Sequence, residues 1–159
     1  ALIGNWTGEL LELSSGAGEQ YRIVDGRETQ CIYHYAHFRH VLTLAYSAYS
    51  QHRMSSSVIL FTLSGQSSIT QDSFESILLK AVRSGDYATQ LEGATPNLAV
   101  LLPLVGVRGS EIFISRCRMS FQETNPPAGI ELQVRTIQFS QQKDLPQLLE
   151  TVEANQSAS

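Results

Sequence analysis

An uninterrupted run of apolar and β-branched residues, Val58 to Leu63, constrains the fold more than any other feature of this sequence. A strand with one face in water alternates polar and apolar residues, whereas a short continuous run is typical of a strand covered on both faces. Its sheet therefore needs helices on both sides. The segment Tyr33 to His52 supplies one of them, because its apolar residues recur three and four apart, as in an amphipathic helix.

Two further strands are expected after this one. The segments Tyr87–Leu91 and Leu98–Leu104 are joined by Glu92–Asn97, whose Gly, Pro and Asn residues favour a hairpin. The remaining expected elements are a helix over Ser73–Arg83 capped by Asp72, a helix over Glu111–Phe121, a strand over Ile130–Phe139 and a last helix containing Leu145 and Val152. This order predicts an α/β fold in which helices sandwich a mixed β-sheet of four or more strands.

The composition limits the size and the partners of this fold. The chain has 159 residues, of which 42% are hydrophobic and 16% charged, enough for one compact core. A formal net charge of −4 argues against nucleic acid as a partner, because broad phosphate binding needs a basic face. Any nucleotide must then be held by a few local arginines. We expect Cys31 and Cys117 to be reduced and structural, since their spacing fits no metal site.

The N-terminal segment differs in character from the rest. Leu2 to Leu13 carries apolar residues at helical spacing and then enters the stretch Ser14 to Gly18, which is rich in Ser and Gly. We expect residues 1–30 to be the terminal helix of an upstream module with its linker, and residues 31–159 to form the domain. No apolar run is long enough to span a membrane.

The stretch from Ala81 to Pro103 carries a specific resemblance. It reads as a helix end, an R-x-x-D tetrad from Arg83 to Asp86, a five-residue strand, a hairpin turn and a strand that ends in L-L-P. In this order it resembles the GGDEF diguanylate cyclases, whose inhibitory site is an R-x-x-D motif placed at this distance before the signature hairpin. The resemblance extends from Phe38 to Val152 and implies the GGDEF, nucleotide-cyclase-like fold.

The sequence departs from the family where an active cyclase binds metal. The resemblance places carboxylates on the first strand and in the hairpin, where they hold the two divalent metals of phosphoryl transfer. Here the strand carries Thr62 and Ser64, and the hairpin has Glu92 as a lone acid. The chain is therefore expected to be a degenerate, noncatalytic GGDEF domain with no metal site, no cofactor and no enzymatic activity.

Noncatalytic members of this family act as receptors for cyclic di-GMP, and the resemblance implies that function here. It further implies an upstream GAF-like module, a membrane exopolysaccharide-synthesis machinery as partner, a role in biofilm formation, and a cytoplasmic domain of a bacterial protein anchored in the inner membrane. A receptor of cellulose synthesis with an R-x-G-D site is a second candidate class. The alternative is a structural or dimerising pseudo-domain that binds no nucleotide and uses the exposed faces of its first two helices.

The expected binding residues are Arg83, Ser84, Gly85 and Asp86. The planar guanidinium of Arg83 can donate two parallel hydrogen bonds to O6 and N7 of guanine, and Asp86 can accept from N1–H and the N2 amino group. We expect Gly85 to let the backbone come close to the ligand and turn sharply. The competing interpretation is that Arg83 and Asp86 simply pair with each other at a helix terminus.

A second arginine on the next helix commonly completes such a site. Arg116 and Arg118 are the candidates, and only one can face the ligand, because they project in opposite directions. We favour Arg118, since Ile112 and Met119 flank the stripe of Arg116, and we expect Arg108 to be a solvated loop charge.

Three histidines, His34, His37 and His40, recur every three residues. No carboxylate or cysteine completes a metal-ligand set at the same spacing, which favours surface or interface histidines.

Overall fold

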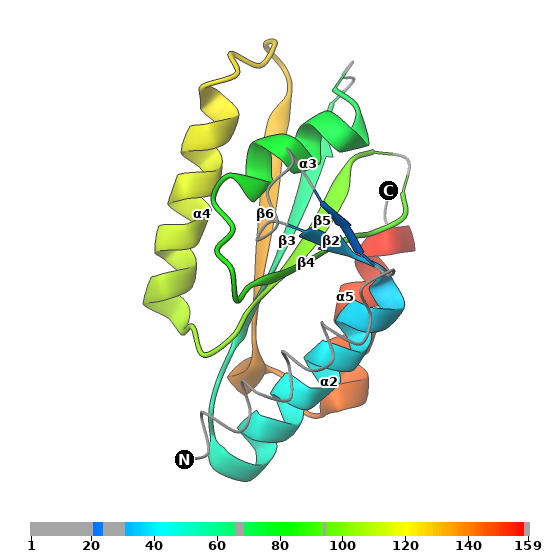
Figure 1. Ribbon diagram of the computed structural model, residues 1–159, viewed down its shortest axis with the longest axis vertical. Coiled ribbons are helices and arrows are strands. Elements are labelled where there is room, and N and C mark those ends of the chain that lie inside the picture. The colour runs from blue at the N-terminus through cyan, green and yellow to red at the C-terminus, as the bar shows by residue number, and fades with distance from the viewer. Residues whose placement is uncertain (1–20, 24–30, 66–68, 94, 158–159) are drawn as a thin grey trace.

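The computed structural model describes residues 21–23, 31–65, 69–93 and 95–157 (Figure 1). In chain order the elements are β1 (Tyr21–Ile23), β2 (Cys31–Tyr33), α2 (Tyr35–His52), β3 (Ser57–Ser64), α3 (Gln71–Leu79), β4 (Tyr87–Gln90), β5 (Asn97–Leu102), α4 (Val107–Gln122), β6 (Glu131–Gln138), the short 3-10 helix η2 (Phe139–Gln141) and α5 (Leu145–Ser157).

The strands form one mixed sheet in the order β1-β2-β4-β5-β3-β6. Strands β2 and β4 are parallel, and every other neighbouring pair is antiparallel. The predicted hairpin is present, with Gln90 opposite Leu98 at its closed end. Strand β3 pairs along most of its length with β5 on one side and β6 on the other, so the apolar run lies inside the sheet.

Helices cover both faces of the sheet, as the apolar run predicted (Figure 1). Val58 and Leu60 point toward the layer formed by α2 and α5. Ile59 and Phe61 point the other way, toward α3 and α4. Strand β3 thus contributes to two separate hydrophobic clusters, which explains why its sequence has no polar face. The expected α/β sandwich with a mixed sheet is confirmed.

Helix α3 differs from its expected form at both ends. Its N-cap is Thr70, whose side-chain oxygen accepts a hydrogen bond from the backbone N–H of Ser73 at 3.2 Å, so Asp72 is not the cap. The helix ends at Leu79 rather than Arg83. The backbone N–H groups of Ala81 and Val82 donate to the carbonyl oxygens of Leu78 and Leu79, both at 3.1 Å, so the chain leaves the helix in tighter three-residue turns. The chain turns toward the sheet instead.

Helix α4 starts four residues earlier than expected, with Gly106 as its N-cap. The backbone N–H of Ser110 donates to the carbonyl oxygen of Gly106 at 3.0 Å, which closes a helical turn before Glu111. Arg108 therefore lies in the first helical turn rather than in a loop, although it is exposed, as expected of a solvated charge.

The sequence did not predict the β1–β2 pair. These strands have three residues each, too few for a periodic pattern to be visible. Strand β1 lies before residue 31, so the sheet extends into the segment expected to be a linker. The expected helix over Leu2–Leu13 lies outside the described residues.

His37 corrects the expectation of surface histidines, because only 6% of it is exposed. Its ring lies 5.1 Å from that of Tyr33, measured between centroids, and burial lowers the pKa of its imidazole, with the charge of His40 as a smaller cause. His34 and His40 are exposed. Among the described residues, no group of three His, Cys, Asp or Glu side chains is arranged to hold a metal ion.

Candidate nucleotide-binding site

The R-x-x-D tetrad forms a tight turn between α3 and β4. The backbone N–H of Asp86 donates to the carbonyl oxygen of Arg83 at 3.1 Å, and Gly85 donates to the same oxygen at 3.1 Å. The carboxylate of Asp86 closes the turn from the other side, since its Oδ2 accepts from the backbone N–H of Arg83 at 3.0 Å. The tetrad thus forms a turn that follows a helix, as expected, but α3 ends at Leu79 and not at Arg83.

The two side chains of the tetrad do not neutralise each other. Within the described part of the chain no ion pair joins the Arg83 guanidinium to Asp86, and Arg83 is exposed. Asp86 is half-buried, and this burial raises the pKa of its carboxyl above the usual value. The hydrogen bond from the Arg83 backbone and the charges of Arg83 and Arg116 act in the opposite direction. Both side chains retain hydrogen-bonding capacity for a ligand.

The sharp turn was expected to depend on glycine at position 85, and the backbone there does not show this dependence. The φ angle of Gly85 is not positive, and a Cβ atom built there would meet no atom within 4 Å. The backbone conformation therefore does not require glycine. The open space in front of Gly85 leaves the main chain accessible from solvent.

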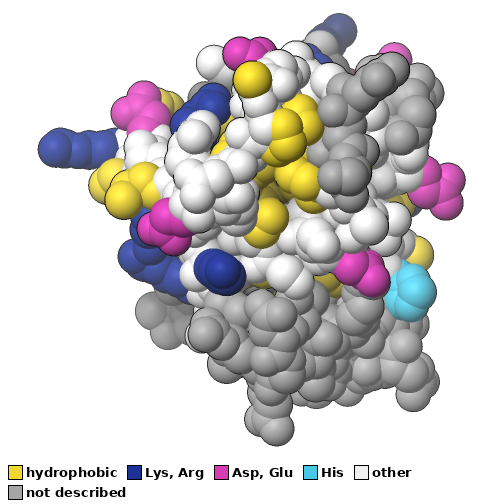
Figure 2. All heavy atoms as spheres, turned by 90° about the horizontal axis from the view of Figure 1, so that it is seen from above, with side chains coloured by type: hydrophobic (Ala, Val, Ile, Leu, Met, Phe, Trp, Pro, Cys, Tyr) yellow, Lys and Arg dark blue, Asp and Glu magenta, His cyan; other side chains and the backbone are white. Residues whose placement is uncertain are grey.

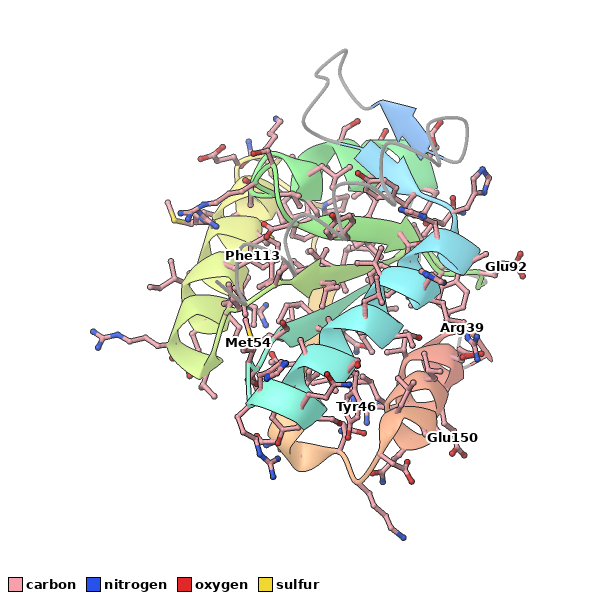
Figure 3. All side chains as sticks on the ribbon, turned by 60° about the horizontal axis from the view of Figure 1, so that its bottom comes forward. Arg39, Tyr46, Met54, Glu92, Phe113 and Glu150 are labelled. Carbon is pink, nitrogen blue, oxygen red and sulfur yellow. The ribbon has the colours of Figure 1, made fainter. Side chains whose placement is uncertain are left out.

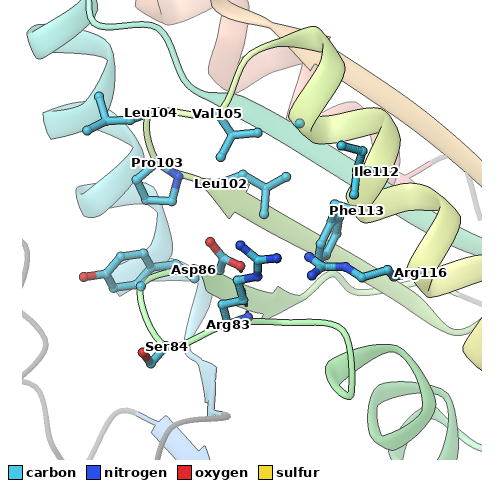
Figure 4. A pocket seen from close by; sticks show the side chains of 13 residues that line it. Arg83, Ser84, Asp86, Leu102, Pro103, Leu104, Val105, Ile112, Phe113 and Arg116 are labelled. Carbon is cyan, nitrogen blue, oxygen red and sulfur yellow. Dashed lines mark hydrogen bonds between the residues drawn. The ribbon is translucent and has the colours of Figure 1, made fainter.

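A pocket of about 480 Å³ opens beside this turn (Figure 4). Its polar end is the tetrad itself, together with Arg116 from α4. Its remaining wall is mostly apolar and comes from the start of β4, the end of β5, the loop that follows β5 and the first half of α4: Tyr87, Leu102, Pro103, Leu104, Val105, Gly109, Ile112 and Phe113. A volume between about 300 and 1,000 Å³ with a few polar groups on an apolar wall is usual for small-molecule sites.

Arg116, not Arg118, reaches this pocket. The Cζ atom of Arg116 lies 5.8 Å from the ring centroid of Phe113, so the guanidinium packs over the aromatic face. Its Nε is buried and has no hydrogen-bond partner. Arg118 lies elsewhere, where its Nη1 donates to the carbonyl oxygen of Leu132 at 3.2 Å. The structure thus brings Arg83, Asp86 and Arg116 together and leaves Arg118 out.

The preference for Arg118 was based on two apolar residues that the structure places in solvent. It assumed that Ile112 and Met119 mark a buried stripe, yet they are 55% and 64% exposed. The buried stripe of α4 is instead Phe113, Cys117 and Phe121. Phe113 and Arg116 are three residues apart, so their side chains are neighbours on the helix. That spacing was the available signal for Arg116.

Cys117 lies behind the pocket in the core. It is a free thiol with no exposed surface, and burial raises its pKa to about 12. Such a thiol is inert, because the thiolate is the reactive form. Cys117 is structural, as expected.

A second polar cluster includes Thr62 on β3, where the resemblance leads us to expect a metal-binding carboxylate in an active cyclase. Thr62 donates to Oδ1 of Asn97 at 2.7 Å. The side-chain amide of Gln71 pairs with the main chain of Asn97, donating to its carbonyl oxygen at 2.9 Å and accepting from its N–H at 3.0 Å. The same amide donates to Glu75, which is 1% exposed, at 2.7 Å. Glu92 is exposed at the hairpin and points outward, away from Phe113 (Figure 3).

Comparisons with known proteins give similarity at the level of the fold. No protein-family model matches the sequence, and no curated protein matches it. A C-terminal fragment of PelD from Pseudomonas aeruginosa PAO1 superposes with a TM-score of 0.62 at 19% identity, covering 77% of this chain and 44% of that chain. The complex of this PelD fragment with c-di-GMP gives 0.62 at 19% identity, covering 74% and 43%.

A diguanylate cyclase is similar to the same extent. SiaD from Pseudomonas aeruginosa, solved in complex with its activator SiaC, superposes with a TM-score of 0.65 at 13% identity, covering 97% of this chain and 64% of that chain. The fold is therefore GGDEF-like, as expected from the resemblance. The chain spans less than half the length of the PelD fragment that it matches.

Proposed function

We propose that this domain is a noncatalytic receptor for cyclic di-GMP that binds the dinucleotide at the turn Arg83–Asp86. The observation that carries the proposal is the convergence of Arg83, Asp86 and Arg116 on one pocket. The solved c-di-GMP complex of PelD, which has a similar fold, supports this choice of ligand.

The chemistry of the three side chains matches a guanine nucleotide. An exposed guanidinium can donate two parallel bonds to O6 and N7 of guanine, and a carboxylate can accept from N1–H and the N2 amino group. Arg83 and Asp86 offer these groups from one turn, held in register by the bond between the Arg83 N–H and the Asp86 carboxylate. Arg116 adds a second cation at the pocket, whose guanidinium can donate to a phosphate oxygen or a base.

The proposal includes the loss of cyclase activity. Phosphoryl transfer needs metal ions to neutralise the triphosphate, and Mg²⁺ prefers carboxylate ligands for that purpose. Thr62 and Asn97 bind each other through a hydroxyl and an amide, and the Gln71 amide is occupied by the Asn97 main chain. These groups are neutral, and the buried carboxylate of Glu75 beside them accepts a hydrogen bond from the Gln71 amide, so this cluster provides one carboxylate rather than the several that a two-metal site requires.

Several finer proposals rest on the resemblance to PelD-type receptors. The boundary expected at residue 31 conflicts with β1 (Tyr21–Ile23), which pairs with β2 in the sheet of the domain. We therefore propose that an upstream GAF-like module with its linker ends before β1, and that the degenerate GGDEF domain includes this strand. We also propose that the domain acts on the cytoplasmic side of an inner-membrane exopolysaccharide machinery of the Pel type and so regulates biofilm formation. Among the described residues, no helix combines the length and the apolar character needed to cross a bilayer.

Calorimetric titration tests the proposal. The parent domain is expected to bind cyclic di-GMP and to prefer it to cyclic di-AMP, whose adenine lacks the O6 acceptor and the N2 amino group. Arg83→Ala is expected to lose about ten- to a hundredfold in affinity, the value of one charge-assisted bond of about 1.5–3 kcal/mol. Arg135→Ala is a matched control, because Arg135 is also exposed but lies on β6.

The outcome distinguishes the two candidate functions. A parent domain that gives no binding heat and no thermal stabilisation with cyclic di-GMP would identify a structural pseudo-domain without a nucleotide. Binding that Arg83→Ala leaves unchanged would place the ligand elsewhere on the domain.

A further inference from the structure

The outer face of α4 exposes two large apolar side chains, Ile112 at the edge of the nucleotide pocket and Met119 outside that pocket. Ile112 is 55% and Met119 is 64% exposed, while the opposite face of the helix packs against the sheet through Phe113 and Phe121. Seen from above, hydrophobic, basic and acidic side chains lie side by side at the left margin in Figure 2, the side on which α4 stands in Figure 1.

Four exposed residues of this face form a narrow line along the helix. They are Arg108, Ile112, Met119 and Glu123, which we call the α4 seam. At 100° per residue all four project within a sector of about 60°. Glu123 is the C-cap and keeps helical dihedral angles, so the line continues to the end of the helix. The seam is apolar in its middle and charged at its ends.

The charges at the ends of the seam oppose the helix dipole. Arg108 lies in the first turn, where the positive end of the dipole disfavours a cation, and Glu123 lies at the C-terminus, where the negative end disfavours an anion. Neither side chain forms an ion pair within the described part of the chain. The helix has no acidic residue in its first turn and no basic residue in its last turn that would compensate.

In an antiparallel second helix of the same sequence, Arg108 would lie beside the negative end of the other helix and Glu123 beside its positive end. Both charges would then interact favourably with the dipole of the partner helix. We propose that the α4 seam is the contact surface for a second copy of this chain, related by a twofold axis that crosses α4 between Ser115 and Arg116. This axis places Ile112 of each copy against Met119 of the other. It also places Arg108 of each copy against Glu123 of the other, beside the negative end of the other helix. Such a surface is self-complementary, as a twofold dimer requires.

The same axis fits the surroundings of the seam. Ser115 lies at its midpoint, is exposed and is small, so two helices can approach each other there. Arg116 follows directly and lines the nucleotide pocket, so each pocket lies at the rim of the interface. One helix from each copy buries less area than the roughly 1,200–2,000 Å² of a standard interface, so the dimer is weak.

Charge reversal tests this dimer. In sedimentation velocity without nucleotide, at concentrations from about 10 μM to 1 mM, the parent is expected to show a reversible monomer–dimer equilibrium, as weak interfaces do. Arg108→Glu and Glu123→Arg are each expected to weaken dimerisation at least about tenfold, because each places like charges across the axis. The double variant R108E/E123R restores opposite charges and is expected to return the dissociation constant to within about threefold of the parent.

Two further variants complete the design. Ile112→Glu places a carboxylate in the apolar centre and is expected to abolish the dimer, with the far-ultraviolet circular dichroism of the parent retained because Ile112 is exposed. Lys143→Glu and Glu150→Arg make the same charge changes at exposed positions away from the seam and should leave the equilibrium unchanged.

A parent that stays monomeric over the whole concentration range would overturn the proposal. The proposal would also fail if the double variant dimerises as weakly as the single variants, or if Ile112→Glu still forms the dimer. Because no nucleotide is present, none of these results bears on cyclic di-GMP binding.

Discussion

The backbone N–H of Arg83 donates a hydrogen bond to the carboxylate of Asp86 over 3.0 Å from N to Oδ2. This bond holds the carboxylate by the main chain and leaves the guanidinium of Arg83 exposed. A direct ion pair between the side chains would instead consume the groups that a ligand needs. The turn therefore presents a donor fork and an acceptor side by side, which is the arrangement that one guanine edge requires.

The first prediction compares two arginines on one helix. Arg116→Ala is expected to weaken cyclic di-GMP binding about tenfold or more, because it removes a cation that lines the pocket. Arg118→Ala is the matched control and should bind as the parent does, since Arg118 donates to the carbonyl oxygen of Leu132 outside the pocket. Calorimetry of both variants measures the difference. An equal loss of affinity in the two variants, or a larger loss in Arg118→Ala, would contradict the assignment of Arg116 to the binding site.

The second prediction concerns specificity through Asp86. Asp86→Asn replaces an acceptor-only carboxylate by an amide with one acceptor and two donors, so at least one donor of guanine loses its partner. The expected loss is about 1.5–3 kcal/mol, or roughly ten- to a hundredfold in affinity for cyclic di-GMP. If Arg83 merely attracts phosphate, removal of the negative charge would strengthen binding of both cyclic di-GMP and cyclic di-AMP. Titration of both dinucleotides separates these results.

The pKa of Asp86 adds a test by pH to the same variant. Burial raises this pKa, and only the ionised carboxylate accepts from both guanine donors, so a proton competes with the ligand. As the pH falls through the raised pKa, the parent should lose affinity, and the loss begins at a higher pH than for an ordinary aspartate. The amide of Asp86→Asn takes up no proton in this pH range, so the affinity of the variant for cyclic di-GMP should not change with pH. A parent profile as flat as that of the variant would remove Asp86 from the binding site.

The sequence predicted the fold well where a hydrophobic pattern extends over several residues, and poorly where the result depends on the orientation of a single side chain. The run Val58–Leu63 predicted a strand covered on both sides, because burial on two faces leaves no room for polar residues. The β1–β2 pair carried no such pattern, since three residues are too few to show a period.

At the site, the tetrad Arg83–Asp86 was identified from its position before the hairpin, and the structure places it beside a pocket. The pocket wall Leu102–Val105 was not foreseen, because its shape depends on how the end of β5 packs against α4. The direction of Arg116 depends on which residues of α4 are buried. Apolar character alone misidentified them, since Ile112 and Met119 face solvent.

The third prediction is the absence of diguanylate cyclase activity. Incubation of the domain with GTP and Mg²⁺ or Mn²⁺ should yield no cyclic di-GMP above buffer, measured by chromatography. The physical reason is that Thr62, at a position where the resemblance leads us to expect a metal-binding carboxylate, is neutral and donates a hydrogen bond to Asn97. An active cyclase assayed in parallel controls the detection. Steady turnover by this domain would refute the noncatalytic assignment.

The fourth prediction tests the polar cluster that replaces the catalytic site. Gln71→Ala removes both side-chain bonds to the main chain of the fully buried Asn97 and should reduce the free energy of unfolding by about 1–3 kcal/mol. Urea denaturation measures this change. Gln122→Ala removes an exposed glutamine from α4 and should have little effect. If the two variants have the same free energy of unfolding, the hydrogen bonds between the Gln71 amide and the Asn97 main chain do not stabilise the hairpin.

The most direct test of the central claim is a titration of isotope-labelled domain with cyclic di-GMP, followed by amide NMR. The backbone amides of Ser84, Gly85 and Asp86 are expected to shift, together with those around Arg116, because these groups line the pocket. The amides at the hairpin, from Gln90 to Glu92, should stay in place. Saturating shifts at the tetrad are the predicted result, and shifts confined to the hairpin with none at Gly85 would contradict the account.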